Sequence, residues 1–304
     1  MGEKIARYRS ARDSAACRSL RNDAVMSANA ERADGRLGRR PVVGVLHPGA
    51  MGAALGSALK ARAGVVIWAD GGRSHNTAKR AELADLIAVP DVAALAQRAD
   101  LVISICPPHA ALEVAEQVAA GLAGQDRASW PLYLDANAVA PGTVRRIGEL
   151  LGADRVVDGA VIGPPAWEPG HTVLWLSGEP AGEVAELFAE SPFDTRVLGA
   201  ELGAASALKA CFALQSKALP AIWLEIAEAA EKAGVSEALH GELTRNGVDL
   251  PARLATLSAR ASTKAWRWAG EMDEAADTML ELGLPDGFSR AAAEVYRRWS
   301  GAAD

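Results

Sequence analysis

The sequence predicts an α/β fold with a doubly wound parallel sheet, followed by an all-α C-terminal domain. Three observations support this prediction. Short apolar runs alternate with Ala-rich helical stretches from Pro41 to about residue 200, which is typical of βαβ units. A glycine-containing turn follows the first apolar run and opens a helix. Beyond residue 200 the apolar periodicity is helical almost throughout.

The expected elements of the first half alternate along the chain. Strands are predicted at 42–46, 65–68, 101–105, 132–135, 156–161, 173–176 and 196–198. Helices are predicted at 51–62, 74–84, 110–122 and 179–190, with a short helix from Asp91 and another after Pro141. This series defines an α/β domain at residues 41–199.

Helices are expected to fill the remainder of the chain, 200–304. A long Ala- and Leu-rich helical pattern covers 202–233 and ends at Gly234, and shorter segments then begin at Ser236, Pro251, Ser262 and Asp286. A helix that is apolar nearly all round must lie inside something. We therefore expect these helices to pack against a second copy of the chain in a homodimer.

Residues 1–40 differ from the rest, because ten lysines and arginines stand against five acids with little periodic hydrophobicity. We interpret them as a disordered tail. An organelle transit peptide is the alternative, although the acids oppose it, and Met26 is an alternative start that would remove residues 1–25.

Composition excludes several classes of function. The net charge is −6 and no basic stripe is present, which opposes nucleic-acid binding. The three cysteines form no CxxC pair and the five histidines no HExxH motif, so we expect a reducing compartment and no metal site. No apolar run is long enough to span a bilayer. The protein is expected to be soluble, cytoplasmic and without membrane partners.

The turn after the first strand is the predicted dinucleotide site, and this makes the α/β domain Rossmann-type. Gly49 would let the backbone approach a pyrophosphate, and Gly52 would let the helix pack closely on the strand. The first glycine of the usual motif is His47 here, so a tight turn in another kind of α/β protein remains the alternative. The predicted cofactor loop comprises His47, Pro48, Gly49, Ala50, Met51 and Gly52.

Two signals compete at the end of the second strand. An acid there, such as Asp70, would select the free ribose hydroxyl of NAD, whereas an arginine clamps the 2′-phosphate of NADP. Arg73 and Ser74 open the next helix and would bring a guanidinium, a hydroxyl and a helix N-terminus to one anion. We favour NADP over NAD, with an Arg73–Asp70 surface pair as the alternative.

Several motifs resemble those of the β-hydroxyacid dehydrogenases, which include 3-hydroxyisobutyrate and 6-phosphogluconate dehydrogenases. They are the 49–52 loop, Arg73-Ser74, Cys106-Pro107-Pro108, the 135–141 segment and the 203–209 segment, in the order found in that family. The similarity covers 41 to about 300. It is closest to a poorly characterised branch with a 6-phosphogluconate dehydrogenase-like NADP-binding domain and a distinctive helical end, matched here at 265–268 and 271–272.

The resemblance implies roles for individual residues. Lys209 matches the family lysine that acts as general acid/base, and a desolvated lysine in an interdomain cleft suits that role. Pro107 and Pro108 would form the far wall of the cofactor groove, and Asn137 and Gly163 would contact the substrate. A lysine reaching out from an Ala-rich helix to solvent is the alternative for Lys209.

The chain also departs from the family pattern. The family's Asp-x-Ser-Thr loop is replaced by Asp135-Ala136-Asn137-Ala138, and its Ser-Gly-Gly turn by Ile162-Gly163-Pro164. Ala213 replaces the asparagine that the family has one turn after the lysine. Lys217 is a competitor for the catalytic role, since eight residues of regular helix place it roughly 80° from Lys209. Substrate identity therefore does not carry over, and a less polar substrate than 6-phosphogluconate is expected.

The resulting prediction is hydride transfer between NADP(H) and the carbinol or carbonyl carbon of a small organic substrate. Imine reduction is one alternative, because imine reductases look similar over this length but usually lack the lysine. A cofactor-binding sensor or scaffold without turnover is the other. Trp266 and Trp268 are interpreted as buried side chains next to a charged helix face, with a cleft-capping role as the alternative.

Overall fold

A computed structural model describes residues 37, 38 and 40–301 of the chain. The disordered tail predicted for 1–40 therefore lies almost wholly outside the described residues. Among the described residues, no helix has both the length and the apolar character that a membrane crossing would require.

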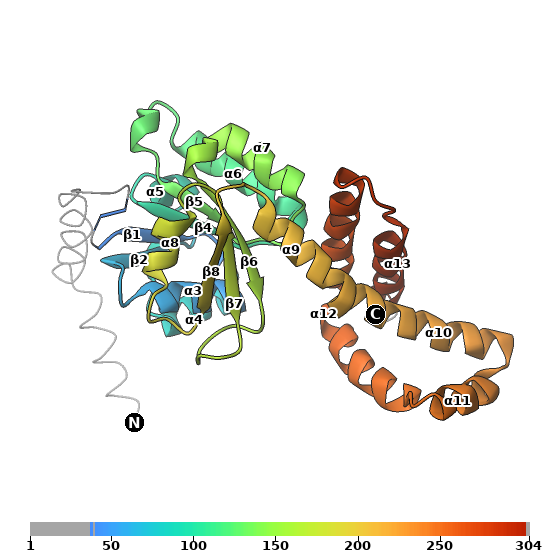
Figure 1. The fold of residues 1–304 in the computed structure, drawn as a ribbon. Coiled ribbons are helices and arrows are strands. Elements are labelled where there is room, and N and C mark those ends of the chain that lie inside the picture. Colours follow the sequence, from blue (N-terminus) through green and yellow to red (C-terminus); the bar gives the residue numbers. More distant parts are fainter. Residues whose placement is uncertain (1–36, 39, 302–304) are drawn as a thin grey trace, which may run out of the picture.

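Eight strands form one sheet in the order β3-β2-β1-β4-β5-β6-β7-β8 (Figure 1). Their bounds are β1 Val42–Val45, β2 Val65–Ala69, β3 Ile87–Val89, β4 Leu101–Ser104, β5 Leu132–Asp135, β6 Val156–Ile162, β7 Val173–Ser177 and β8 Asp194–Gly199. Every neighbouring pair is parallel except β6 with β7. The predicted doubly wound, Rossmann-type sheet is confirmed. Strand β3 was not predicted, because three residues carry too little periodicity to be recognised.

Helices cover both faces of the sheet (Figure 1). Alternate residues of β1 point to opposite faces, so Val43 and Val45 join one apolar core and Val42 the other. The first core is closed by α3 Ala50–Leu59, α4 His75–Leu83 and α8 Ala181–Leu187. The second is closed by α5 Val92–Ala96, α6 Ala111–Gly121 and α7 Pro141–Leu151. Within the described residues, 3-10 turns connect elements at η1 Pro108–Ala110, η2 Arg127–Ser129 and η3 Ala153–Arg155.

A helical half follows the last strand, as the sequence predicts. It comprises α9 Ala204–Ala213, a π-helical turn at Leu214–Ala218, α10 Leu219–Ala233, α11 Ser236–Arg245, α12 Leu250–Glu281 and α13 Gly287–Gly301. Gly234 ends α10 in the left-handed conformation, with φ of 69°. The predicted helix start at Ser262 is wrong. That residue lies inside α12, where its hydroxyl donates to the Ala259 carbonyl at 3.1 Å instead of capping a helix.

The tryptophans of α12 differ in environment. Trp268 is buried and packs edge to face on Tyr296 of α13, with ring centroids 5.2 Å apart. Trp266 is 60% exposed, so the expectation that both are buried is wrong. Two residues of α-helix correspond to about 200° of rotation, and the two rings therefore leave α12 on opposite sides.

Helix α12 is joined to the sheet domain through the first turn of α7. Glu274 accepts a hydrogen bond from the Ala140 backbone N–H at 2.7 Å, and Glu281 accepts one from the Gly142 N–H at 2.9 Å. Glu281 also pairs with Arg145 at 2.6 Å. Because the N-terminus of a helix is the positive end of its dipole, both carboxylates bind where negative charge is favoured.

Candidate functional site

The glycine turn lies between the end of β1 and the start of α3. Gly49 is the N-cap of α3, and no side chain caps this helix and no acid lies in its first turn. A Cβ added at Gly49 would meet nothing within 4 Å, whereas one at Gly52 would lie 2.1 Å from the His47 carbonyl oxygen. The loop is thus closely packed at Gly52, whereas the space next to Gly49 is open.

Two polar groups beside this loop have buried atoms without a partner. These atoms are His47 Nδ1 and Arg73 Nε. Burial and, to a smaller extent, the nearby Arg73 charge lower the pKa of His47 to about 4. The imidazole is therefore neutral at ordinary pH. The Arg73 charge also acts on Cys106 after β4, so the guanidinium lies near the carboxyl ends of β1 and β4.

The other residues at the end of β2 face solvent. Asp70 is exposed, and its backbone N–H donates to the Val89 carbonyl at 3.0 Å. Ser74 caps α4, since its hydroxyl accepts from the Thr77 N–H at 3.3 Å. No Arg73–Asp70 ion pair is found among the described residues, although the sequence allowed for one.

The loops after β4 and β5 are tied together by Asn137. Its side-chain oxygen accepts from the Cys106 N–H at 2.5 Å. Its side-chain nitrogen donates to Ser104 at 3.1 Å and to Asp135 at 2.8 Å. All its amide groups are thus engaged within the protein, and a substrate contact would have to displace one of them. Pro107 and Pro108 lead from this tie into η1.

Two buried carboxylates lie opposite each other in the register of β5 and β6. They are Asp135 and Asp158. Burial raises the pKa of Asp135 to about 7, against the opposing effect of the Asn137 hydrogen bonds. Burial also raises the pKa of Asp158. Asp158 accepts from the Ser206 N–H at 2.8 Å and the Ser206 hydroxyl at 2.6 Å, and so anchors the start of α9.

Lys209 lies on α9 at the wall of a small crevice between the sheet domain and α12. Burial lowers the pKa of its amine to about 8; the Glu271 carboxylate opposes this shift, and the Lys217 ammonium adds to it. A lysine of this kind exchanges protons near neutral pH. The crevice is lined by Ala138, Val139, Ser206, Lys209, Ala210, Ala213, Lys217, Glu271, Glu274 and Ala275.

Two of the residues that line the crevice, Lys217 and Glu271, belong to an ionic cluster. Glu271 is 9% exposed and pairs with Lys217 at 2.9 Å through one oxygen. Its other oxygen pairs with Arg267, also at 2.9 Å. Lys217, Lys209 and Arg267 together hold the pKa of Glu271 below its usual range in spite of burial. The carboxylate is therefore charged.

The structure brings some of the predicted site residues together and leaves others apart. Lys209 and its competitor Lys217 share the crevice, whereas Asn137 and Gly163 do not line it. Gly163 follows β6 in an exposed turn with φ of 137°. Sequence reasoning missed Glu271 and Glu274. The spacing of Arg267 and Glu271, four residues apart on one helix, was a signal for their ion pair, but nothing local links Glu271 to Lys217.

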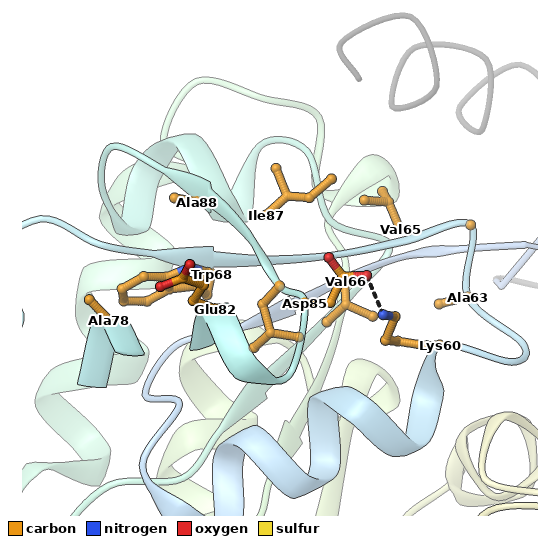
Figure 2. A pocket seen from close by; sticks show the side chains of 12 residues that line it. Lys60, Ala63, Val65, Val66, Trp68, Ala78, Glu82, Asp85, Ile87 and Ala88 are labelled. Carbon is orange, nitrogen blue, oxygen red and sulfur yellow. Dashed lines mark hydrogen bonds and ion pairs between the residues drawn. The ribbon is translucent and has the colours of Figure 1, made fainter. Parts of the chain in front are cut away.

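A larger hollow of about 540 Å³ lies at the opposite end of α3 (Figure 2). It is lined by Lys60, Ala63, Gly64, Val65, Val66, Trp68, Ala78, Glu82, Asp85, Leu86, Ile87 and Ala88, and a 2.5 Å ion pair joins Lys60 to Asp85. Several of these residues belong to the amino-terminal end of β2. In open parallel sheets, ligands bind at the carboxyl ends of the strands, so this hollow is not the expected cofactor site.

Comparison with known proteins identifies one family match, in the helical half. Residues 230–299 match a domain of unknown function, DUF1932. A curated relative, an uncharacterized 28.5 kDa protein in the 7S RNA 5′ region of Methanothermus fervidus, is 30% identical over 168 residues. That alignment covers 55% of this chain and only 62% of the relative's length.

Solved structures match over most of the chain. A conserved protein of unknown function, MTH1747, described as structurally similar to 3-hydroxyacid dehydrogenases, is 25% identical with a TM-score of 0.61, over 86% of this chain and 97% of that one. Mycobacterium tuberculosis 3-hydroxyisobutyrate dehydrogenase is 19% identical with a TM-score of 0.63, over 86% and 94%. A reductive aminase from Aspergillus terreus in complex with NADPH and ethyl levulinate is 19% identical with a TM-score of 0.50, over 85% and 93%.

These matches confirm the resemblance found in the motifs. The chain carries a DUF1932 domain and has the fold of the 3-hydroxyacid dehydrogenases.

Proposed function

We propose that this chain is an NADP-dependent oxidoreductase acting on the carbinol or carbonyl carbon of a small organic substrate, with Lys209 as general acid/base. One observation carries the proposal: a lysine with a pKa lowered to about 8 lines the crevice between the sheet domain and the helical half. The fold shared with 3-hydroxyacid dehydrogenases supports it.

The glycine turn fits a dinucleotide. The open space above Gly49 and the uncapped first turn of α3 are what a bound pyrophosphate would require. His47, Pro48, Gly49, Ala50, Met51 and Gly52 would hold the phosphates, and Pro107 and Pro108 would border the nicotinamide end. When bound, the cofactor supplies or accepts the hydride.

Arg73 is the reason for favouring NADP over NAD. Its guanidinium is a fixed cation next to the loop, and Ser74 begins the neighbouring helix. The Arg73→Ala variant should lose at least about tenfold in its discrimination of NADPH over NADH, the order of one charged hydrogen bond. The two dissociation constants, measured by fluorescence titration, check this. An unaltered ratio would remove Arg73 from the 2′-phosphate role.

Lys209 would exchange the proton that hydride transfer requires at the substrate oxygen. An amine with a pKa near 8 is present in both protonation states around neutral pH, so it can give a proton during reduction and take one during oxidation. Asn137 and Gly163 remain proposed substrate contacts. Asn137 would act here by giving up one of its present partners.

The Lys209→Met variant tests the assignment, since methionine keeps the length of the side chain and removes the amine. We expect loss of turnover with NADPH affinity retained. Turnover is followed as NADPH oxidation against panels of ketones and imines. The imine panel tests the reaction class of the reductive aminase that shares this fold. Undiminished turnover in the variant would contradict the assignment.

A cytoplasmic homodimer formed through the helical half is also part of the proposal. Three apolar side chains of α9 and α10 are 42–46% exposed in the single chain: Phe212, Leu219 and Ile222. Such a group fits an interface between copies. Analytical ultracentrifugation of the full chain gives the answer, and a monomer at micromolar concentration would contradict this part.

A further inference from the structure

The carboxylate next to Lys209 is already occupied by two other cations. Glu271 binds Lys217 through one oxygen and Arg267 through the other, each at 2.9 Å. Lys209 lies close enough for the Glu271 charge to raise its pKa. Within the described part of the chain, however, no hydrogen bond or ion pair from its amine is found. Its amine is therefore available to the crevice.

The π-helical turn accounts for the position of Lys217. In a regular α-helix, eight residues correspond to about 800°, which would turn Lys217 roughly 80° away from Lys209. A π turn bonds residue i to i+5 and so accommodates one extra residue. With the extra residue absorbed, Lys217 points as the seventh residue after Lys209 would in a regular helix. Seven residues correspond to about 700° of rotation, which brings Lys217 within roughly 20° of Lys209. The turn is held from α13, because the Tyr296 hydroxyl donates to the Lys217 carbonyl at 2.7 Å.

We propose that Lys217 is a positioning residue for Lys209: by occupying Glu271, it keeps the Lys209 amine unpaired and directed into the crevice. This inference rests on the proposed general acid/base role of Lys209. It assigns the π turn a purpose, which is to bring a second lysine to the same helix face. Glu271 is a positioning residue as well, since it holds Lys217 in place.

The charged groups that act on Lys209 come from three elements. Glu271 and Arg267 face it from α12, Lys217 from the π turn and Asp135 from β5. Removing Lys217 takes away a like charge and leaves one oxygen of Glu271 without a partner. Both changes stabilise the Lys209 ammonium, so its pKa should rise as it pairs with Glu271. Removing Glu271 should lower it.

The test is a titration of Lys209 that needs neither substrate nor cofactor. The full chain is labelled with acetic anhydride at a series of pH values, and mass spectrometry measures the acetylation of the Lys209 peptide. The wild-type midpoint should lie near 8. In Lys217→Met it should move up by about one to three pH units, the effect of an opposite charge at close range. In the double variant Lys217→Met/Glu271→Gln it should return toward the wild-type midpoint.

Two outcomes would overturn the proposal. One is an unmoved midpoint in Lys217→Met, and the other is a double variant displaced as far as the single one. If the cluster were only a brace between helices, these changes would lower the melting temperature without moving the Lys209 titration. The matched control is Lys232→Met, which removes an exposed lysine paired with Glu228 on α10 and should leave the midpoint in place.

A second variant keeps the test decisive if Lys217→Met does not fold. The Arg267 side chain is 53% exposed, so Arg267→Gln should be tolerated, and it frees the other oxygen of Glu271. The Lys209 midpoint should again rise, by less. The two proposals can fail separately. Turnover in Lys209→Met tests the proton-exchange role of Lys209, whereas the Lys209 titration tests the positioning role of Lys217.

Discussion

The glycine turn and the Lys209 crevice are built from different materials. The turn is a backbone device, contiguous from His47 to Gly52, in which two glycines provide space and close packing. The crevice is a side-chain device assembled from α9, the π turn and α12. A site formed by the backbone of one short segment can therefore be recognised from the spacing of its residues. A site formed by charged side chains of several helices cannot, because its geometry depends on how helices distant in the sequence pack together.

The two regions also differ in what burial does to them. Near the turn, burial keeps His47 neutral next to the fixed charge of Arg73. Around the crevice, burial raises the pKa of Asp135 and lowers that of Lys209, so both are brought toward neutral pH. In the folded protein, Asp135 and Lys209 therefore change charge near neutral pH, whereas His47 stays neutral down to about pH 4.

The largest expected effect is the pH dependence of stability caused by Asp135. Its pKa is raised from 3.8 to about 7, so the folded state favours the protonated acid. The stabilisation is fully present below the unfolded pKa and is lost as pH rises through 7. The shift corresponds to roughly 4 kcal/mol in the free energy of unfolding. Urea unfolding of the wild type and Asp135→Asn between pH 4 and 8 should show the stability of the wild type falling relative to that of the variant as pH rises.

The interpretation depends on the slope, because the asparagine at 135 would also disturb the hydrogen bonds from Asn137. Asp277→Asn serves as the control, since that carboxylate is 54% exposed and pairs with Arg290 at the surface. Its pH profile should follow the wild type. Parallel profiles for all three proteins would show that Asp135 is not the source of the dependence.

An effect of intermediate size is expected from substituting the two glycines of the turn, which should act on different properties. A Cβ at Gly52 would lie 2.1 Å from a backbone oxygen, so Gly52→Ala must shift α3 and should cost about 1–3 kcal/mol of stability. A Cβ at Gly49 meets nothing, and Gly49→Ala should fold normally. Because the open side is where the pyrophosphate is proposed to lie, Gly49→Ala should still weaken NADPH binding by about tenfold or more.

Thermal unfolding and NADPH titration of both variants check this pair. The difference between each variant and the wild type should be the same at pH 6 and at pH 8, because neither substitution removes a titrating group. A stable Gly49→Ala protein with unchanged NADPH affinity would place the nucleotide elsewhere.

Particular residues show how far the sequence could be interpreted. The sheet and its helices follow from alternating apolar runs, and Gly234 and Asp91 mark a helix end and a helix start by local chemistry. Strand β3 was too short to be recognised. Ser262 was predicted to start a helix because serine is a common N-cap residue. Inside α12, however, its hydroxyl bonds to a backbone carbonyl of the same helix.

The crevice shows where sequence interpretation ends. Lys209 was found through a family motif, but the direction of Lys217 was computed for a regular helix, and the π turn changes it. A π turn leaves no local pattern as clear as a glycine cap. The Lys217–Glu271 pair spans 54 residues between two helices, so only the packing of α12 against α9 determines it.

The smallest expected effect tests the joint between the two regions. Glu281 at the end of α12 binds the Gly142 N–H and Arg145 at the start of α7. The Glu281→Gln variant keeps the shape and removes the charge, so it should lose about 1 kcal/mol from the helix dipole and a partly exposed ion pair. Chemical denaturation measures this, with Glu242→Gln as control, because its pair with Arg245 is exposed on α11. The Lys209 titration should stay in place, since Glu281 does not line the crevice. If that titration moved with the loss of stability, the crevice would depend on the joint, and its charges could not be treated as an independent unit.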